Sequence, residues 1–255
     1  MSISAKCGQL AEYWDLVPAI LGGVIGALAG GIPAWLLAKR QSDETLSRDA
    51  TQRIDDQKAR AFSTAVKLIY IINSTIGLRI HVKSCMAVRE DPSRAHMDPW
   101  QVLIPMIGET DEGAIRFTAD EMAVFAAAGE FDFMQDMMLL AVRHASSSAA
   151  FQEYCMMRSE FLRVGPKPVA FDGQIGSTTL TPEEAVSFLP YTIPLNNVAL
   201  GLDARLDEDV RLSRSVAAKF GPVTKKYFKV EQFASLTFPT DEELSAMMKP
   251  LNPTE

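Results

Sequence analysis

Three histidines and three cysteines are the residues of this chain best suited to chemistry. His81 and Cys85 lie four residues apart, so on a helix both side chains would project from one face. Imidazole and thiolate bind zinc, but a structural zinc site has four ligands, and two are too few. His96 and His144 belong to no metalloprotease or nucleophile motif. We therefore predict ordinary packing or surface placement for these side chains, with no catalytic residue, no metal site and no cofactor.

Methionines gather on one predicted helical segment, beside Cys155. Thioethers and thiolates are the soft ligands that Cu(I) prefers. Core filling by adaptable side chains produces the same pattern, and a pliable partner-binding groove is a further alternative. Core filling is the prediction for this group, which comprises Met134, Met137, Met138, Met156 and Met157.

Composition and charge exclude several classes of protein. The 255 residues are 47% hydrophobic, which is ample for one large domain or two small ones. The formal net charge is −7, whereas a surface that binds nucleic acid needs clustered Lys and Arg. No glycine-rich phosphate loop is present, and the acidic cluster Asp207–Asp209 lacks the alternating spacing of a calcium loop. Nucleic acid is therefore not an expected partner.

An uncharged apolar run from Leu16 to Ala38 precedes the charged part of the chain. About 20 residues at about 1.5 Å rise cover the roughly 30 Å of a bilayer core, so this run is long enough to cross one. Trp14 and Trp35 lie near its two ends, where indole rings favour the membrane interface. The run predicts a single transmembrane helix over residues 16–38, and the lipid bilayer is a partner.

Small residues recur every four positions along this run. Without a hydrophobic drive between helices in lipid, association depends on close backbone approach, which such rows permit. A lone anchor with incidental glycines is the alternative. The rows predict a glycine zipper that packs against another span, through Gly22, Gly26 and Gly30 and the adjacent Gly23, Ala27 and Gly31.

A cleaved signal peptide is a rival interpretation, because residues 27–29 read Ala-Leu-Ala. The apolar run continues well past that point and ends at Lys39 and Arg40, as a stop-transfer sequence does. Lys6 is the one Lys or Arg before the run, whereas several follow it. The excess of positive charge marks the cytoplasmic side, so we expect a single-pass protein of the cell (inner) membrane with residues 1–15 outside.

Residues 39–90 predict a juxtamembrane stalk that continues into a long helix. Up to residue 60 the segment is dense in charge and has neither Gly nor Pro. From Phe62 onward, apolar residues alternate in steps of four and three, the rhythm of a packed helix, with Asn73 inside the seam. An Asn there fixes register in an oligomer or finds a partner inside a monomeric bundle. The predicted oligomer seam comprises Val66, Ile69, Asn73, Ile76 and Ile80.

Residues 91–255 predict a helical cytoplasmic domain. Thr118 and Glu121 form a capping box, and Gly129 interrupts the helix that follows. A second helix is expected from about Glu130 to Arg163. The chain as a whole is therefore expected to be all-α, with a transmembrane helix, a stalk and a C-terminal helical domain.

Prolines divide the rest of the predicted domain. Thr181 begins a helix that we expect Pro190 and Pro194 to end early, because proline removes a helical hydrogen bond. The next helix is expected over Leu195–Phe220, and Thr240 begins a last short one.

These features favour a non-catalytic, homo-oligomeric tether, scaffold or regulator that presents a helical surface at the membrane. One alternative is a membrane-anchored enzyme of the hydrolytic class, whose scattered site residues leave no local motif. It would be favoured by a pocket where two or more of His81, His96, His144 or acidic residues converge. A pore formed by the glycine-rich span is a weaker alternative. The sequence does not identify the protein partner or substrate.

Overall fold

The computed structural model describes residues 7–106, 115–167, 170–172 and 175–247. Residues 7–32 and the two short strands are described as backbone only. The chain divides into two compact units, Met1–Asp56 and Gln57–Glu255. The fold is all-α apart from one short hairpin, as predicted.

The first unit consists, in its described part, of one helix. Helix α1 (Cys7–Ala87) begins in this unit and continues into the second. Side chains from Pro33 to Asp56 are exposed, and those of Trp35, Leu36 and Leu37 belong to the predicted span. From Lys39 onward the segment is charged and has few apolar residues to bury, which fits the solvated helix expected there.

On length and composition alone, α1 is long and apolar enough to cross a membrane. Among the described residues, the range that meets this criterion is Pro33–Glu90. This range includes the 3-10 turn η1 (Val88–Glu90). Half of the most apolar stretch within the range is buried. Residues 39–60 carry many charges, so the apolar stretch of that range follows residue 60, where α1 is a core helix. Most of the predicted span over 16–38, with all six glycine-row residues, lies outside the described side chains.

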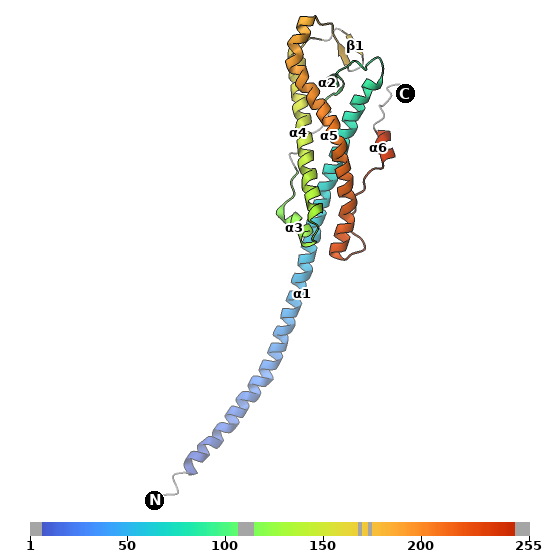
Figure 1. Ribbon diagram of the computed structural model, residues 1–255. Helices are drawn as coiled ribbons and strands as arrows, with labels where there is room; N and C mark the ends of the chain where they lie inside the picture. Colours follow the sequence, from blue (N-terminus) through green and yellow to red (C-terminus); the bar gives the residue numbers. More distant parts are fainter. Residues whose placement is uncertain (1–6, 107–114, 168–169, 173–174, 248–255) are drawn as a thin grey trace. The chain divides into compact units, whose positions relative to one another are not determined.

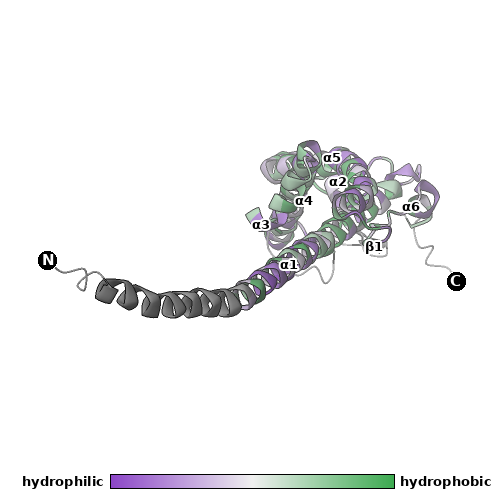
Figure 2. Ribbon diagram, turned by 90° about the horizontal axis from the view of Figure 1, so that it is seen from below, coloured by the Kyte–Doolittle hydropathy of each residue, from purple (hydrophilic) through white to green (hydrophobic). Residues whose placement is uncertain are grey.

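The second unit is built on three long helices that lie side by side (Figure 1). They are α1 from Gln57 onward, α4 (Phe131–Val164) and α5 (Pro182–Phe228). The second half of the predicted 39–90 segment thus belongs to this bundle. Figure 2 shows hydrophobic and hydrophilic residues mixed along all three helices. Buried hydrophobic residues of each helix pack against those of the other two.

Short elements close the two ends of the bundle (Figure 1). Helix α3 (Ala119–Ala127) lies at the end where α4 begins, and α2 (Pro99–Val102) lies toward the other end. An antiparallel hairpin of β1 (Ala170–Asp172) and β2 (Ile175–Ser177) precedes α5. Helix α6 (Asp241–Met247) follows α5, and Arg214 of α5 forms an ion pair with Asp241.

The start signals in the sequence are confirmed. Thr118 and Thr181 each accept a hydrogen bond from a backbone N–H three residues on, and the glutamate there bonds back to complete a capping box. Thr240 and Glu243 make the same pair of bonds before α6. The break at Gly129 is also found, since α3 ends two residues before it.

The expected break in α5 is wrong. Pro190, Pro194 and Pro222 all lie inside one continuous helix. Each proline removes a single backbone hydrogen bond, and all three are exposed, so water can reach the carbonyl groups left over. Near Pro190 and Pro194, the buried side chains of Leu195 and Ala199 pack in the core and stabilise the continuous helix.

The core of the bundle forms two separate apolar clusters. The first lies toward α3 and includes Leu68, Met137 and Phe220. The second lies toward α2 and includes Val82, Tyr154 and Leu202. Ion pairs on α1 and α5 flank the second cluster, where Lys83 contacts Asp203 and Asp207 at 2.9 and 3.1 Å.

Candidate interaction surface and buried polar layer

Helix α1 carries an exposed apolar stripe on the face that the bundle does not cover. Phe62, Val66 and Ile69 are 59%, 52% and 46% exposed, and Asn73 follows them on the same face. Their spacing of four, three and four residues keeps them aligned along one side of the helix. We call these four residues the α1 stripe.

The face of α1 that packs in the bundle is a different one. Its buried residues are Ala61, Thr64, Ala65, Leu68, Ile71, Ile72 and Thr75. A soluble helix normally has one apolar face and one polar face, but α1 is apolar on both sides in this region. Exposed apolar residues aligned on one helix face are a candidate interaction surface.

The predicted seam is divided by the structure. Val66, Ile69 and Asn73 are exposed, Ile76 is buried in the first cluster, and Ile80 packs partly against it. Asn73 therefore has no place inside the monomeric bundle. The predicted role inside a monomeric bundle is therefore wrong, and the predicted role in an oligomer seam stays a prediction.

The methionine group is also divided. Met137 is fully buried in the first cluster, and Met134 and Met157 pack partly against the core. Met138 and Met156 are more than half exposed, so core filling applies to only part of the group. Met138 joins other exposed apolar residues on the outer face of α4, namely Phe131, Leu139 and Val142.

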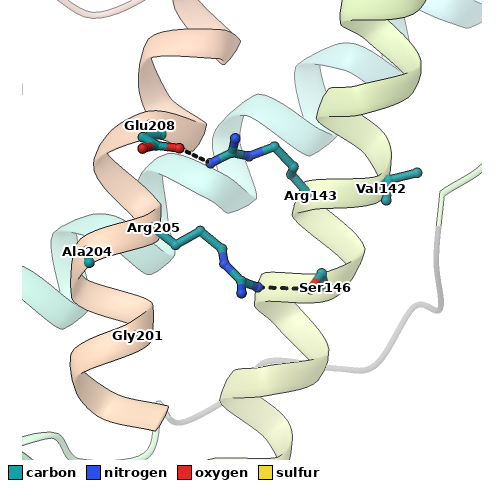
Figure 3. Close-up of a pocket in the computed structure, with 7 residues that line it drawn as sticks. All are labelled: Val142, Arg143, Ser146, Gly201, Ala204, Arg205 and Glu208. Carbon is teal, nitrogen blue, oxygen red and sulfur yellow. Dashed lines mark hydrogen bonds and ion pairs between the residues drawn. The ribbon is translucent and has the colours of Figure 1, made fainter. Parts of the chain in front are cut away.

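An open groove of about 470 Å³ lies between α4 and α5, beside Val142 (Figure 3). Gly201 and Ala204 make it deep, because they place no large side chain there. Arg143 donates to Glu208 at 2.8 Å and Arg205 to Ser146 at 3.0 Å, as Figure 3 shows. Arg143 and Arg205 against Glu208 give the lining a net positive charge.

Several buried polar side chains lie at or near the boundary between the two apolar clusters. Asp209 and Ser213 of α5 are fully buried, and His144 of α4 is 7% exposed. Ser147 of α4 and Thr75 of α1 complete the layer at nearly full burial. We call these five residues the polar layer.

Asp209 is held as a buried carboxylate. One of its oxygens accepts a short hydrogen bond from Nε of Arg143, and the other accepts one from Ser147 Oγ at 2.9 Å. The guanidinium of Arg143 also pairs with Glu208 at the surface. A buried carboxylate requires this kind of pairing, because an unpaired charge in the interior is costly.

His144 and Ser213 have no such partners. Among the described residues, neither ring nitrogen of His144 forms a hydrogen bond. Ser213 Oγ also has no hydrogen-bond partner there. The ring of Tyr70 lies edge-on to His144, with 6.4 Å between centroids. Burial lowers the pKa of His144 below its ordinary value, and the negative charge of Asp209 opposes this shift only in part.

Ser147, His144 and Asp209 do not have the arrangement of a hydrolase triad. In a triad the histidine bonds both the nucleophile and the acid, whereas here Ser147 bonds Asp209 directly. The group also lies in the core, and Arg143 and Glu208 alone connect it to the groove. The geometry does not supply an activated serine.

His81 and Cys85 do lie on one face of α1, as their spacing predicts. The Nε2 atom of His81 is 2.7 Å from the carbonyl oxygen of Ile104 and 3.8 Å from the sulfur of Cys85. Burial would raise the pKa of Cys85, but contacts with His81 and the backbone of Ile104 outweigh it and hold the pKa below its ordinary value. No group of three or more potential metal ligands occurs among the described residues, and His96 is exposed.

The polar layer was missed by sequence reasoning, although a signal was present. On α5, Asp209 and Ser213 fall at the helical spacing of Leu206, Val210, Val216 and Phe220, so polar residues interrupt an apolar face. On α4, His144 and Ser147 interrupt the face of Leu140 and Phe151. That these interruptions meet in one layer depends on how the helices are aligned.

The chain matches no family model, and no curated protein or solved structure is detectably similar to it.

Proposed function

We propose that the protein is a membrane-anchored, non-catalytic scaffold or tether that assembles from copies of itself through the α1 stripe. The observation that carries this proposal is the exposed apolar face of Phe62, Val66 and Ile69 on a helix whose opposite face is already buried. Burial of such a face against a second copy would remove apolar surface from water at roughly 25 cal/mol per Å².

The helix that bears the stripe favours a second copy as the occupant. Copies anchored through the same N-terminal span would have the same orientation. Equivalent helices of two neighbouring copies would therefore run parallel to each other. Parallel identical helices place equal positions opposite one another, and the spacing of four and three residues suits such a contact. Asn73 would then face Asn73, a pairing that fixes register at some cost in stability.

The glycine rows of the predicted span would add a second contact within the bilayer. Gly22, Gly26 and Gly30 would allow two spans to approach closely. We propose the cell (inner) membrane as the location, with residues 1–15 outside and the helical domain in the cytoplasm, as the distribution of Lys and Arg favours.

Light scattering of the full chain in detergent micelles tests the assembly. We expect an oligomer from the parent and a shift toward monomer in the double variant Val66→Glu and Ile69→Glu, because charge at these positions would be buried at the contact. Val142→Glu is the control, since Val142 is even more exposed, at 66%, but lies on α4. Asn73→Leu should change the oligomer number without abolishing assembly.

Two results would count against this assembly. A monomeric parent would refute it outright, and equal loss of assembly with Val142→Glu would place the contact on α4. Gly26→Leu separates the contribution of the span, because it leaves the α1 stripe intact. The partner or cargo that the scaffold holds would be sought by pull-down from native membranes.

A further inference from the structure

The polar layer contains buried groups that the bundle does not satisfy. Apolar clusters on either side of it are held by close packing, whereas the layer contains a buried carboxylate, a histidine without hydrogen bonds and a serine without a partner. Each unsatisfied buried polar group costs about 1–3 kcal/mol relative to its hydrated form. Opening the bundle at this level would let water satisfy these groups.

Both ring nitrogens of His144 lack a hydrogen-bond partner among the described residues, so a protonated ring in the closed bundle would have two unsatisfied N–H groups. From α5, Asp209 is the nearby carboxylate, and Arg143 and Ser147 each donate one hydrogen bond to it. From α1, Tyr70 presents a ring edge. On α4 itself, Arg143 is a cation one residue away, and Glu208 of α5 is engaged with it at the surface.

We infer that the polar layer is an acid-sensitive lock: proton uptake by His144 opens the bundle locally between its two apolar clusters. An imidazolium formed in the closed layer would be a second cation beside Arg143, with one carboxylate in the interior to serve both. Separation of α4 from α1 and α5 at this level would hydrate the charge. The packed clusters on both sides confine the opening to the middle of the bundle.

The direction of the pH effect follows from the environment of the ring. The pKa of His144 is lower in the closed bundle than in an exposed, opened form, so the opened form binds the extra proton. The closed form is therefore fully favoured above about pH 6.5, the ordinary histidine value, and loses stability as the pH falls below it. Carboxylates respond below about pH 4.5, outside this window.

Histidine ring signals in the NMR spectrum of the unmodified full chain in micelles give the first measurement. The chain has three histidines, so each signal can be assigned with single variants. We expect the His144 ring to stay neutral to a pH below the ordinary histidine value of about 6.5. A His144 ring that titrates at or above that ordinary value would overturn the inference.

Amide hydrogen exchange between pH 7.5 and pH 5 gives the second measurement. If the opened form has an ordinary histidine pKa, protection factors at residues 141–147 and 209–213 should fall over this range, by at most about 30-fold when the closed form takes up no proton. His144→Gln should abolish that fall, whereas the matched variant His96→Gln should retain it. Unchanged protection in the parent, or a fall that persists in His144→Gln, would refute the lock.

Discussion

At the scale of single residues, Glu121 shows how a buried charge is stabilised at the end of the bundle. It is 5% exposed, and its carboxylate accepts hydrogen bonds from Ser63 at 2.7 Å, Lys67 at 2.8 Å and the backbone N–H of Thr118 at 2.7 Å. Burial would raise its pKa, but these donors outweigh burial and hold the pKa below its ordinary value. Glu121 thus caps α3 and ties it to α1 at once.

Replacement of Glu121 by Gln should lower the free energy of unfolding by about 2 kcal/mol at pH 7, because Lys67 loses its partner. Since the pKa is depressed in the folded state, this stabilisation is present above about pH 4.5 and is lost as the pH falls through the folded pKa. Urea denaturation at pH 7 and at pH 3.5 should therefore show a difference from the parent that shrinks at low pH.

Glu184→Gln provides the control for that experiment. Glu184 occupies the same position in the capping box of α5 but is exposed. Its replacement should have a smaller effect at both pH values, and an equal effect would mean that capping rather than burial explains the result.

At the scale of elements, two helix ends use the left-handed backbone region in different ways. Gly129, with φ of 73°, follows α3, and the N–H groups of Gly129 and Glu130 bond the carbonyls of Ala126 and Phe125. Lys229, with φ of 53° and ψ of 43°, ends α5. A side chain is disfavoured in this region, so the end of α5 is strained where the end of α3 is not.

The variant Lys229→Gly should therefore stabilise the protein by about 0.5–1 kcal/mol, because glycine adopts the left-handed region without a penalty. Gly129→Ala should destabilise it by a similar amount, and the cost would come from the backbone, since a Cβ there meets no atom within 4 Å. Thermal unfolding of both variants checks the pair. Shifts of the same sign would contradict this account of the helix ends.

At the scale of the whole molecule, the three long helices determine which residues meet. Helices α1 and α4 both contribute to the two apolar clusters, and α5 returns antiparallel between the same ends of the bundle (Figure 1). Because α4 and α5 each run through both clusters, buried polar residues far apart in sequence, such as Ser147 and Asp209, meet between them. The same arrangement leaves the opposite face of α1 uncovered.

Membrane topology is a property of the entire chain, and Cys7 allows it to be measured. In the proposed orientation Cys7 lies outside the cell, whereas Cys85 and Cys155 lie in the cytoplasmic domain. A membrane-impermeant maleimide should label the variant Cys85→Ser and Cys155→Ser on intact cells. The variant Cys7→Ser should be labelled only after permeabilisation, because its remaining thiols would be inside.

The opposite labelling pattern would reverse the proposed orientation. Recovery of either variant in the soluble fraction would remove the anchor itself, and with it the argument that copies are held parallel. The proposal that two α1 stripes contact each other would then lose the parallel arrangement of copies on which it depends.

Local structure was largely determined by the sequence. Thr118, Thr181 and Thr240 mark helix starts because a hydroxyl oxygen satisfies a backbone N–H that no helical carbonyl can reach. Gly129 marks a helix end for an equally local reason. The all-α class follows from these signals and from the apolar spacing, which depend on residues within one or two turns of each other.

The tertiary structure alone decided which apolar face of α1 is covered and which polar residues meet. Both faces of α1 have helical spacing, so spacing cannot tell Leu68, which is buried, from Val66, which is exposed. Pro190 and Pro194 were expected to end α5, but packing of Leu195 outweighs one lost hydrogen bond at each. The polar layer joins residues more than 60 positions apart, and such contacts are fixed by the alignment of whole helices, which no local pattern records.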